Sequence, residues 1–262
     1  MSATLEPRVV ERPFWKRWLK MSWQLLARSP VRFGLLIALL GWVDTTAVNL
    51  AFGHVIPKIW VQRLGMMLLP ALFALISAAA RGADDHRQTW TVLRALLHLQ
   101  FWVKALVAGA ALVAFEWVTR HAWLFFPDPS AKEVYSHESG ALLTSFAAQT
   151  VLLVWVLGIC YAPLMVFWPE LSFQEARKLS QSASQMNNPS HILFLICGVM
   201  LVGVPLTLIP AYGMTEAAML VFMGILGYVA YRDIFERRDE NLPALVSTSA
   251  VVAISPVTDY AP

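Results

Sequence analysis

Long apolar runs separated by short basic connections constrain this chain more than any other feature of its sequence. The runs lie near residues 31–52, 59–80, 99–118, 141–168, 190–209 and 215–231. Each is close to the roughly 20 apolar residues that a helix needs to cross the hydrocarbon core of a bilayer. Only 14% of the residues are charged, whereas soluble domains average about 25%. The sequence therefore predicts an all-α polytopic membrane protein with about six transmembrane helices plus amphipathic surface helices.

The positions of lysine and arginine predict how the chain is oriented. Basic residues gather before the first run, between the second and third, after the fourth and after the sixth, as in Arg12, Arg87, Arg177 and Arg237. Because cytoplasmic connections are enriched in lysine and arginine, we expect both termini to be cytoplasmic. We predict a cytoplasmic N-terminus with an amphipathic helix over 1–30, a six-helix transmembrane domain over 31–235 and a flexible cytoplasmic tail over 236–262.

Residues 14–28 are predicted to form an amphipathic helix at the membrane surface. One side carries Phe14, Trp18, Met21 and Leu25, and we expect the polar side to point away from it, with Lys16, Arg17, Lys20, Gln24 and Arg28. Tryptophan beside lysine and arginine is typical of a helix that lies at the headgroup layer and turns its cations toward anionic lipid. We interpret the helix as a membrane anchor, and the alternative is a docking helix for a protein partner.

A second surface helix is predicted after the fourth apolar run. Ser172 is suited to begin it, and Glu175, three residues later, completes the pattern of a capping box. Pro189 ends it, since the residue before a proline disfavours helical backbone. Together the two helices give a candidate lipid or partner surface that consists of Trp15, Lys16, Arg17, Trp18, Lys20, Arg177 and Lys178.

The end of the fourth run carries two prolines, Pro163 and Pro169. Such prolines free backbone carbonyls that another group must satisfy. We interpret them as a kink followed by an interfacial stop, and the alternative is a hinge or a polar site at the kink.

The spacing also suggests an internal repeat. Residues 14–30 and 173–189 both run from phenylalanine to proline over the same distance, and an apolar hairpin follows each; residues 87–100 resemble a third copy without the proline. Three units, each a surface helix followed by a helical hairpin, would account for six spans.

One group of polar residues lies within the predicted spans and forms the candidate intramembrane polar site. Its members are Asp44, Thr45 and Asn49 in the first run and Glu116 near the end of the third. A carboxylate at this depth is costly unless it is neutral, paired or hydrated. The group is interpreted either as a structural or hydrated polar contact, or as part of an ion or proton pathway.

Other chemistry finds little support in the sequence. The histidines are scattered without ligand spacing, and no phosphate loop, Gly-x-Ser-x-Gly or His-Glu-x-x-His motif occurs. Cys160 and Cys197 lie inside apolar runs and are interpreted as small buried hydrophobic residues. We therefore expect no enzyme activity, no cofactor, no metal and no nucleic-acid partner.

Short motifs at both ends of the chain resemble those of a known group of proteins. Trp15, Trp18 and Trp23-Gln-Leu-Leu precede Ser29-Pro30, and Ala162-Pro163, Leu171-Ser172, Glu175-Ala176, Leu179-Ser180 and Asn188-Pro189 follow later. This pattern is similar to that of uncharacterised proteobacterial six-helix inner-membrane proteins, which are loosely similar to the membrane domain of some glycerophosphodiester phosphodiesterases. The resemblance implies a bacterial inner membrane and a six-helix fold with surface helices, and it implies no activity.

Two functional hypotheses follow. The first is a non-enzymatic accessory, scaffold or lipid-interacting protein whose partners are the bilayer, its anionic lipids and a membrane protein. The alternative is a small-molecule or ion transporter or channel that uses Asp44 and Glu116.

Overall fold

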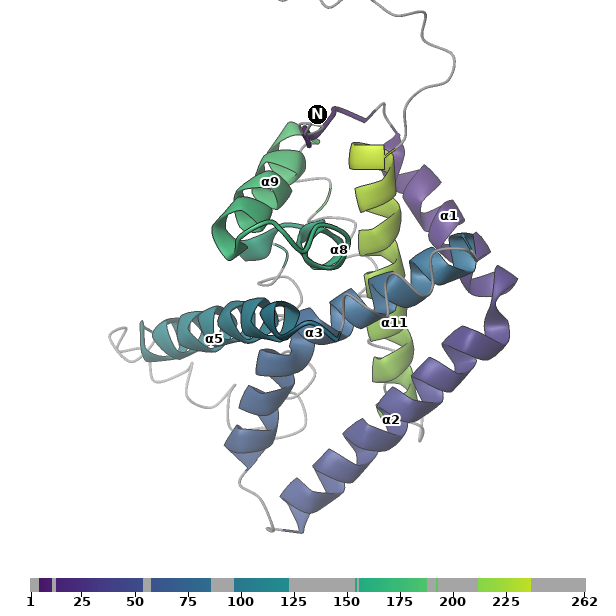
Figure 1. The fold of residues 1–262 in the computed structure, drawn as a ribbon. Helices are drawn as coiled ribbons and strands as arrows, with labels where there is room; N and C mark the ends of the chain where they lie inside the picture. Colours follow the sequence, from purple (N-terminus) through teal and green to yellow (C-terminus); the bar gives the residue numbers. More distant parts are fainter. Residues whose placement is uncertain are drawn as a thin grey trace, which may run out of the picture.

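The computed structural model describes residues 5–10, 13–53, 58–85, 97–122, 154, 156–187, 192 and 212–236. Within these residues all regular secondary structure is helical (Figure 1). The α-helices are α1 (Phe14–Arg28), α2 (Pro30–Phe52), α3 (Lys58–Asp84), α5 (Leu99–Ala122), α8 (Tyr161–Phe167), α9 (Phe173–Met186) and α11 (Tyr212–Tyr231), and a π-helix, η3 (Arg232–Glu236), continues α11. The all-α prediction is confirmed for this part of the chain. Outside it lie residues 141–153 of the predicted fourth run, nearly all of the predicted fifth run and tail, and residues 87–96 of the predicted third repeat copy.

Three described segments are long and apolar enough to cross a membrane. They are Pro30–Ala47 in α2, Arg63–Asp84 in α3 and Ala217–Glu236, which joins α11 to η3. They correspond to the first, second and sixth predicted runs. The third run is also helical, as α5 (Leu99–Ala122), and its described side chains form an apolar stretch over Leu99–Ala114.

The last part of α3 lies between the start of α2 and the end of α11 (Figure 1). Arg32 Nη1 near the start of α2 donates a 3.3 Å hydrogen bond to the carbonyl of Ala79 in the last part of α3. Arg232, directly after α11, pairs with Asp84 at the end of α3. The two helices α2 and α3 are therefore antiparallel, and the basic ends of three predicted spans meet, as the charge pattern suggests.

The helix α3 is bent near its middle, and its two arms point in different directions (Figure 1). Pro70 lies inside the helix, where proline removes one backbone hydrogen bond and crowds the preceding turn. The second arm runs to Asp84, four residues beyond the end of the predicted apolar run at residue 80.

Close packing of α5 on α3 depends on small side chains. Ala105 and Ala108 of α5 are buried, and a Cβ atom built on Gly109 would overlap the carbonyl oxygen of Met67. The small residues Ala105 and Gly109, four positions apart on one side of α5, therefore let the two helix backbones approach closely.

The fourth predicted run is not one helix up to Trp168, and that prediction is wrong for its last part. Gly158 has φ +81°, a left-handed conformation that glycine adopts without steric cost, and it separates a helical turn that reaches Leu157 from α8. A side chain at Gly158 would meet Ser180 of α9, whose carbonyl oxygen would lie 2.6 Å from its Cβ. The chain bends here because α9 passes so close to it.

The positions of Pro163 and Pro169 agree with a short helix α8 that begins at Tyr161 and ends at Phe167. Pro163 lies in the first turn of α8, where its missing N–H costs no helical hydrogen bond. Pro169 follows α8, and the Lys104 ammonium of α5 donates a hydrogen bond to its carbonyl. Pro163 thus begins a short helix rather than kinking a long one.

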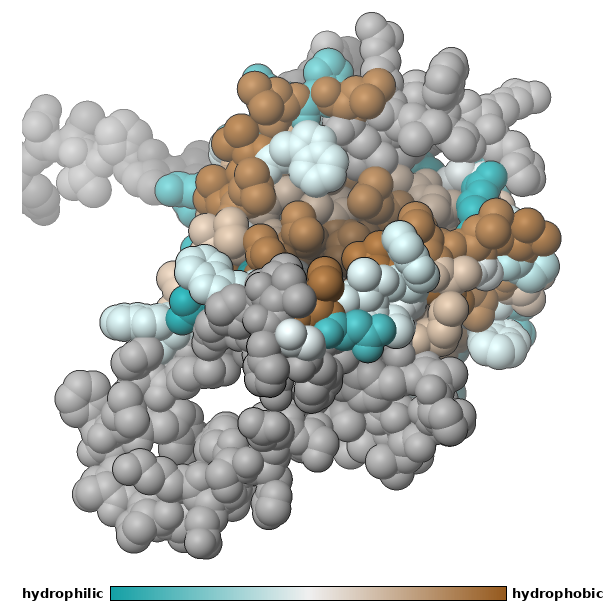
Figure 2. Space-filling model, turned by 90° about the horizontal axis from the view of Figure 1, so that it is seen from below, coloured by the Kyte–Doolittle hydropathy of each residue, from teal (hydrophilic) through white to brown (hydrophobic). Residues whose placement is uncertain are grey.

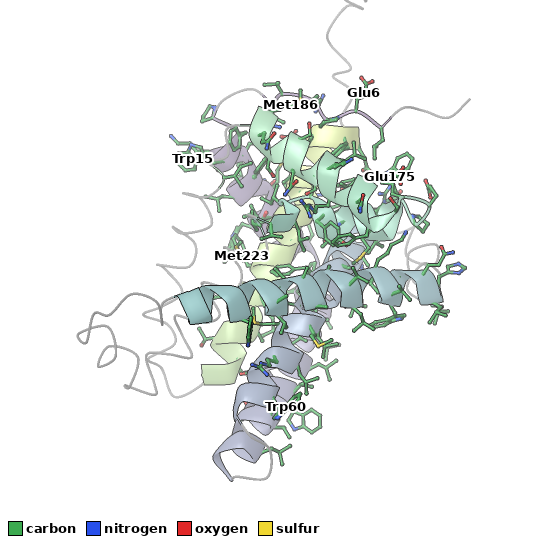
Figure 3. The ribbon with its side chains drawn as sticks, turned by 90° about the vertical axis from the view of Figure 1, so that its left-hand side faces the viewer. Glu6, Trp15, Trp60, Glu175, Met186 and Met223 are labelled. Carbon is green, nitrogen blue, oxygen red and sulfur yellow. The ribbon has the colours of Figure 1, made fainter. Side chains whose placement is uncertain are left out.

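The predicted capping box at the start of α9 is confirmed. Glu175 N–H donates to Ser172 Oγ at 3.3 Å, and Ser172 N–H donates to Glu175 Oε2 at 2.8 Å. These hydrogen bonds with Ser172 favour the carboxylate and lower the pKa of Glu175 below its ordinary value. Trp60 marks the far end of the molecule from this helix, on the first arm of α3 (Figure 3).

We predict that Gly109→Ala lowers the stability of the purified protein by about 1–3 kcal/mol, the usual cost of overpacking a tight contact. The matched control is Gly65→Ala in α3, because a Cβ there meets nothing within 4 Å and alanine is the better helix former. Thermal unfolding in mild detergent measures both. Equal melting temperatures for the two variants would contradict the close α3–α5 contact.

Candidate functional site

A buried carboxylate at the end of α11 is the centre of the largest polar network in the described residues. Asp233 belongs to η3 and has no exposed surface. Single-turn π-helices are rare and occur frequently at functional sites. A buried acid is stable only when it is paired and hydrogen-bonded, so the partners of Asp233 define the site.

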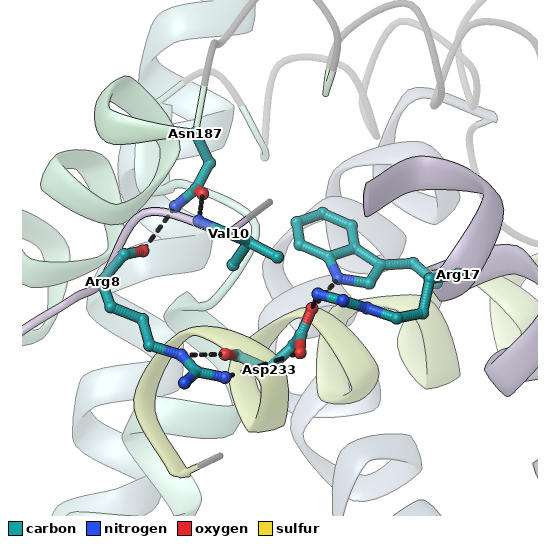
Figure 4. Close-up of polar contacts among 6 residues, drawn as sticks. Arg8, Val10, Arg17, Asn187 and Asp233 are labelled. Carbon is teal, nitrogen blue, oxygen red and sulfur yellow. Dashed lines mark hydrogen bonds and ion pairs between the residues drawn. The ribbon is translucent and has the colours of Figure 1, made fainter. Parts of the chain in front are cut away.

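Those partners come from the N-terminal part of the chain (Figure 4). Trp18 Nε1 of α1 donates a 2.8 Å hydrogen bond to Asp233 Oδ2, and the Arg17 guanidinium pairs with the same oxygen. Arg8 Nη2 lies 3.7 Å from Oδ1, and Arg8 Nε donates to the Asp233 carbonyl at 2.6 Å. The carboxylate therefore connects both α1 and the segment before it to the end of α11.

Asn187, directly after α9, holds the same N-terminal segment by its backbone (Figure 4). Its Oδ1 accepts the Val10 N–H at 2.7 Å, and its Nδ2 donates to the Arg8 carbonyl at 3.0 Å. The Arg8 N–H in turn donates to the Ile234 carbonyl at 3.3 Å. Residues 8–10 are thus held between α9 and η3.

A second set of polar contacts joins α3 to α11 at the same end. Asp84 pairs with Arg232 and accepts a 3.1 Å hydrogen bond from the Tyr228 hydroxyl. Arg81 pairs with Glu236 at 2.6 Å, and its guanidinium carbon lies 4.5 Å from the centre of the Phe167 ring. Asp84, the last residue of α3, therefore connects this helix to the end of α11.

Two members of the predicted lipid or partner surface are engaged inside the protein, one of them entirely. Trp18 is fully buried, and Arg17 turns toward Asp233 instead of pointing away. The helical period put Arg17 on the polar side, but a long side chain next to the apolar stripe reaches the buried acid beneath it. The prediction is wrong for Trp18, which is buried. Arg17 keeps a partly exposed side chain, and its pairing with Asp233 could not be predicted because the acid lies far away in the sequence.

The other members fit an exposed surface better. Lys16, Lys20, Arg177 and Lys178 are exposed, and Trp15 is half-buried with Lys16 Nζ 5.3 Å from its ring centre. Trp23, which the surface prediction omitted, is 65% exposed. It follows Lys16 and Lys20 at spacings of seven and three residues, and Arg28 in the last turn of α1 is exposed as well. We call Lys16, Lys20, Trp23 and Arg28 the cationic face of α1.

The predicted polar site is divided between two helices. Asp44, Thr45 and Asn49 lie on α2, where Thr45 Oγ1 donates to the Gly41 carbonyl at 2.7 Å. Asp44 is half-buried, and its Oδ2 has no hydrogen-bond partner among the described residues. Glu116 lies on α5 with a side chain outside the described part, and Figure 1 shows α5 and α2 on opposite sides of α3.

Neither Asp233 nor Asn187 stands out in the sequence by itself. An acid between Arg232 and the arginines at 237 and 238 was a usable signal, because charges at the end of an apolar run tend to pair. For Asn187 the sequence offered only its place before a helix-ending proline. In the described regions no three histidine, cysteine or acidic side chains are close enough to hold a metal ion.

Comparisons with protein families, with curated proteins and with solved structures found no match to this chain.

We predict that Asp233→Ala destabilises the protein by about 3 kcal/mol, because it leaves two arginines without their acid. This is the lower end of the cost of breaking a buried pair, since the Arg17 side chain is 37% exposed. The control is Glu236→Ala, which removes a more exposed pair and should cost less than about 1 kcal/mol. Thermal unfolding in detergent compares the two, and equal losses would contradict the central role of Asp233.

Proposed function

We propose that this chain is a multi-pass protein of the bacterial inner membrane that acts as a non-enzymatic accessory, scaffold or lipid-interacting protein. In this proposal six helices cross the membrane and both termini are cytoplasmic. The cationic face of α1 and the basic residues of α9 contact anionic lipid or a membrane-protein partner.

The exposed apolar surface supports membrane insertion. On α2, large apolar side chains recur on the outside, with Val31 74%, Leu35 68% and Trp42 65% exposed. Trp60, Leu64 and Leu68 continue this surface on the first arm of α3. Figure 2 shows apolar side chains over much of the described lower face. Exposed patches of this extent are typical of proteins whose surface is covered by lipid or by another protein.

One observation carries the proposal: an exposed apolar helix follows directly after an exposed cationic one. The cationic face of α1 ends at Arg28, and the apolar outside of α2 begins at Val31. Ser29 separates the helices. A bilayer offers the same two environments in the same order, first anionic headgroups and then hydrocarbon.

The orientation, the number of spans, the cell compartment and the repeats are inferred from the sequence. The meeting of the basic ends of α2, α3 and α11 supports a cytoplasmic location for that end through the positive-inside rule. The resemblance to proteobacterial six-helix inner-membrane proteins supports six spans and the cell compartment. Three helix-hairpin repeats remain the simplest arrangement that gives each hairpin its own surface helix.

We expect the change Lys16→Gln/Lys20→Gln/Arg28→Gln to reduce the anionic lipid that co-purifies with the protein from native membranes. Each basic residue near an anionic surface contributes about 1 kcal/mol, so enrichment over zwitterionic lipid should fall more than tenfold. Lipid mass spectrometry measures it at low and high salt.

The matched control, Lys16→Arg/Lys20→Arg/Arg28→Lys, keeps every charge and should keep the enrichment. High salt should weaken the enrichment in wild type, since it screens exposed charges. An unchanged lipid profile in the glutamine variant would refute a lipid-binding role for α1.

A second candidate function is transport through the polar part of α2. The observation in its favour is the Asp44 carboxylate, whose Oδ2 is buried without a hydrogen-bond partner among the described residues. Ionisable groups in such positions frequently belong to ion or proton pathways, and Glu116 is the proposed second acid.

If the chain transports ions, Asp44→Asn should abolish proton or cation flux in proteoliposomes, because the amide cannot change its charge. Thr46→Ala on the same helix is the control, since Thr46 is exposed and only bonds the Trp42 carbonyl. Undiminished flux in Asp44→Asn, or no flux in wild type under any ion gradient, would remove this candidate.

A further inference from the structure

Residues 8–10 are bound to the rest of the protein in the manner of a peptide ligand. The Asn187 side chain accepts from the Val10 N–H and donates to the Arg8 carbonyl. The Ile234 carbonyl accepts the Arg8 N–H from the other side. The Asn187 amide thus gives this segment the hydrogen-bond donor and acceptor that the backbone of a neighbouring strand would offer. Many proteins bind extended peptides through such hydrogen bonds to the peptide backbone.

Side chains add selectivity to these backbone contacts. Val9 is 65% exposed whereas Val10 is 6% exposed and packs in the apolar core, the alternation of an extended segment. Arg8 reaches both the carboxylate and the carbonyl of Asp233. The contacts therefore select an arginine and, two residues later, an aliphatic side chain.

The buried Asp233 carboxylate remains paired when residues 8–10 are not bound. When Arg8 leaves, Asp233 keeps the Arg17 guanidinium and the Trp18 indole. Both belong to α1, whose position is fixed by its buried side chains Phe14, Trp18 and Leu25. Departure of residues 8–10 consequently leaves no unpaired buried carboxylate.

We propose that Asn187, Asp233 and the Ile234 carbonyl form a docking site for an extended Arg-x-aliphatic segment of a partner protein, and that residues 8–10 occupy it as an intramolecular competitor. This inference rests on the proposed accessory function and defines its partner by chemistry. A buried acid that already holds two donors and still binds a third, from Arg8, argues for a basic ligand. The tether gives residues 8–10 an effective concentration that a free partner must overcome.

The test uses the full-length chain in detergent and a fluorescent peptide with the sequence of residues 5–10. In Arg8→Ala/Val10→Asp the chain's own segment cannot bind, so the site is open. We expect this variant to bind the peptide at least tenfold more tightly than wild type, measured by fluorescence anisotropy. Adding Asn187→Ala should weaken binding about tenfold, since it removes two hydrogen bonds, while Gln185→Ala, an exposed neighbour on α9, should not.

Two altered peptides test the same contacts without changing the protein, because Asn187→Ala also removes a hydrogen bond to the Ala183 carbonyl and could unfold α9. A peptide with alanine in place of Arg8, and one with an N-methyl group on the Val10 amide, should each bind about tenfold more weakly. Equal binding to wild type and to the open variant, or undiminished binding of both altered peptides, would overturn the proposal.

The same experiments separate this inference from the proposed function. Absence of peptide binding together with normal anionic-lipid enrichment overturns the docking site alone. Concentration-dependent dimerisation of wild type that is lost in Arg8→Ala/Val10→Asp would identify a second copy of the chain as the occupant and would overturn the partner peptide.

Discussion

The buried Asp233 carboxylate is the interaction on which the described structure depends. It lies at the end of the most buried apolar helix, where an ionised group is stable only with close cationic and hydrogen-bonding partners. Arg8, Arg17 and Trp18 supply them. Because all three precede the first membrane-length helix, one carboxylate fixes the N-terminal part of the chain against its last described element. The position of α1 follows from this contact as much as from its amphipathic pattern.

The position of α1 has a consequence for function. Because Trp18 and Arg17 contact Asp233, the side of the helix that carries Lys16, Lys20 and Trp23 faces outward, and Arg28 is exposed at its end. The helix therefore packs on the bundle with one side and presents cations with the other. Exposed apolar side chains begin directly after it on α2. A lipid-facing or partner-facing role for this region agrees with both observations.

Small residues and local breaks determine how the other helices approach one another. Gly109 permits the α3–α5 contact, and Gly158 allows the chain to turn beneath α9. The helical period of a sequence detects neither feature, since it reports which side is apolar and not which backbone comes close.

The sequence alone determined the helical class, the bounds of α1 and α2, the capping box of α9 and the clustering of basic residues at particular connections. These properties depend on composition, on the 3.6-residue period and on contacts between residues a few positions apart. Tertiary structure decided that Trp18 and Arg17 face inward, that Asp84 pairs with Arg232 and that Asn187 holds residues 8–10. Each of these pairs joins residues more than 140 positions apart, and a buried charge selects its partner by proximity in space, which a local pattern in the sequence does not encode.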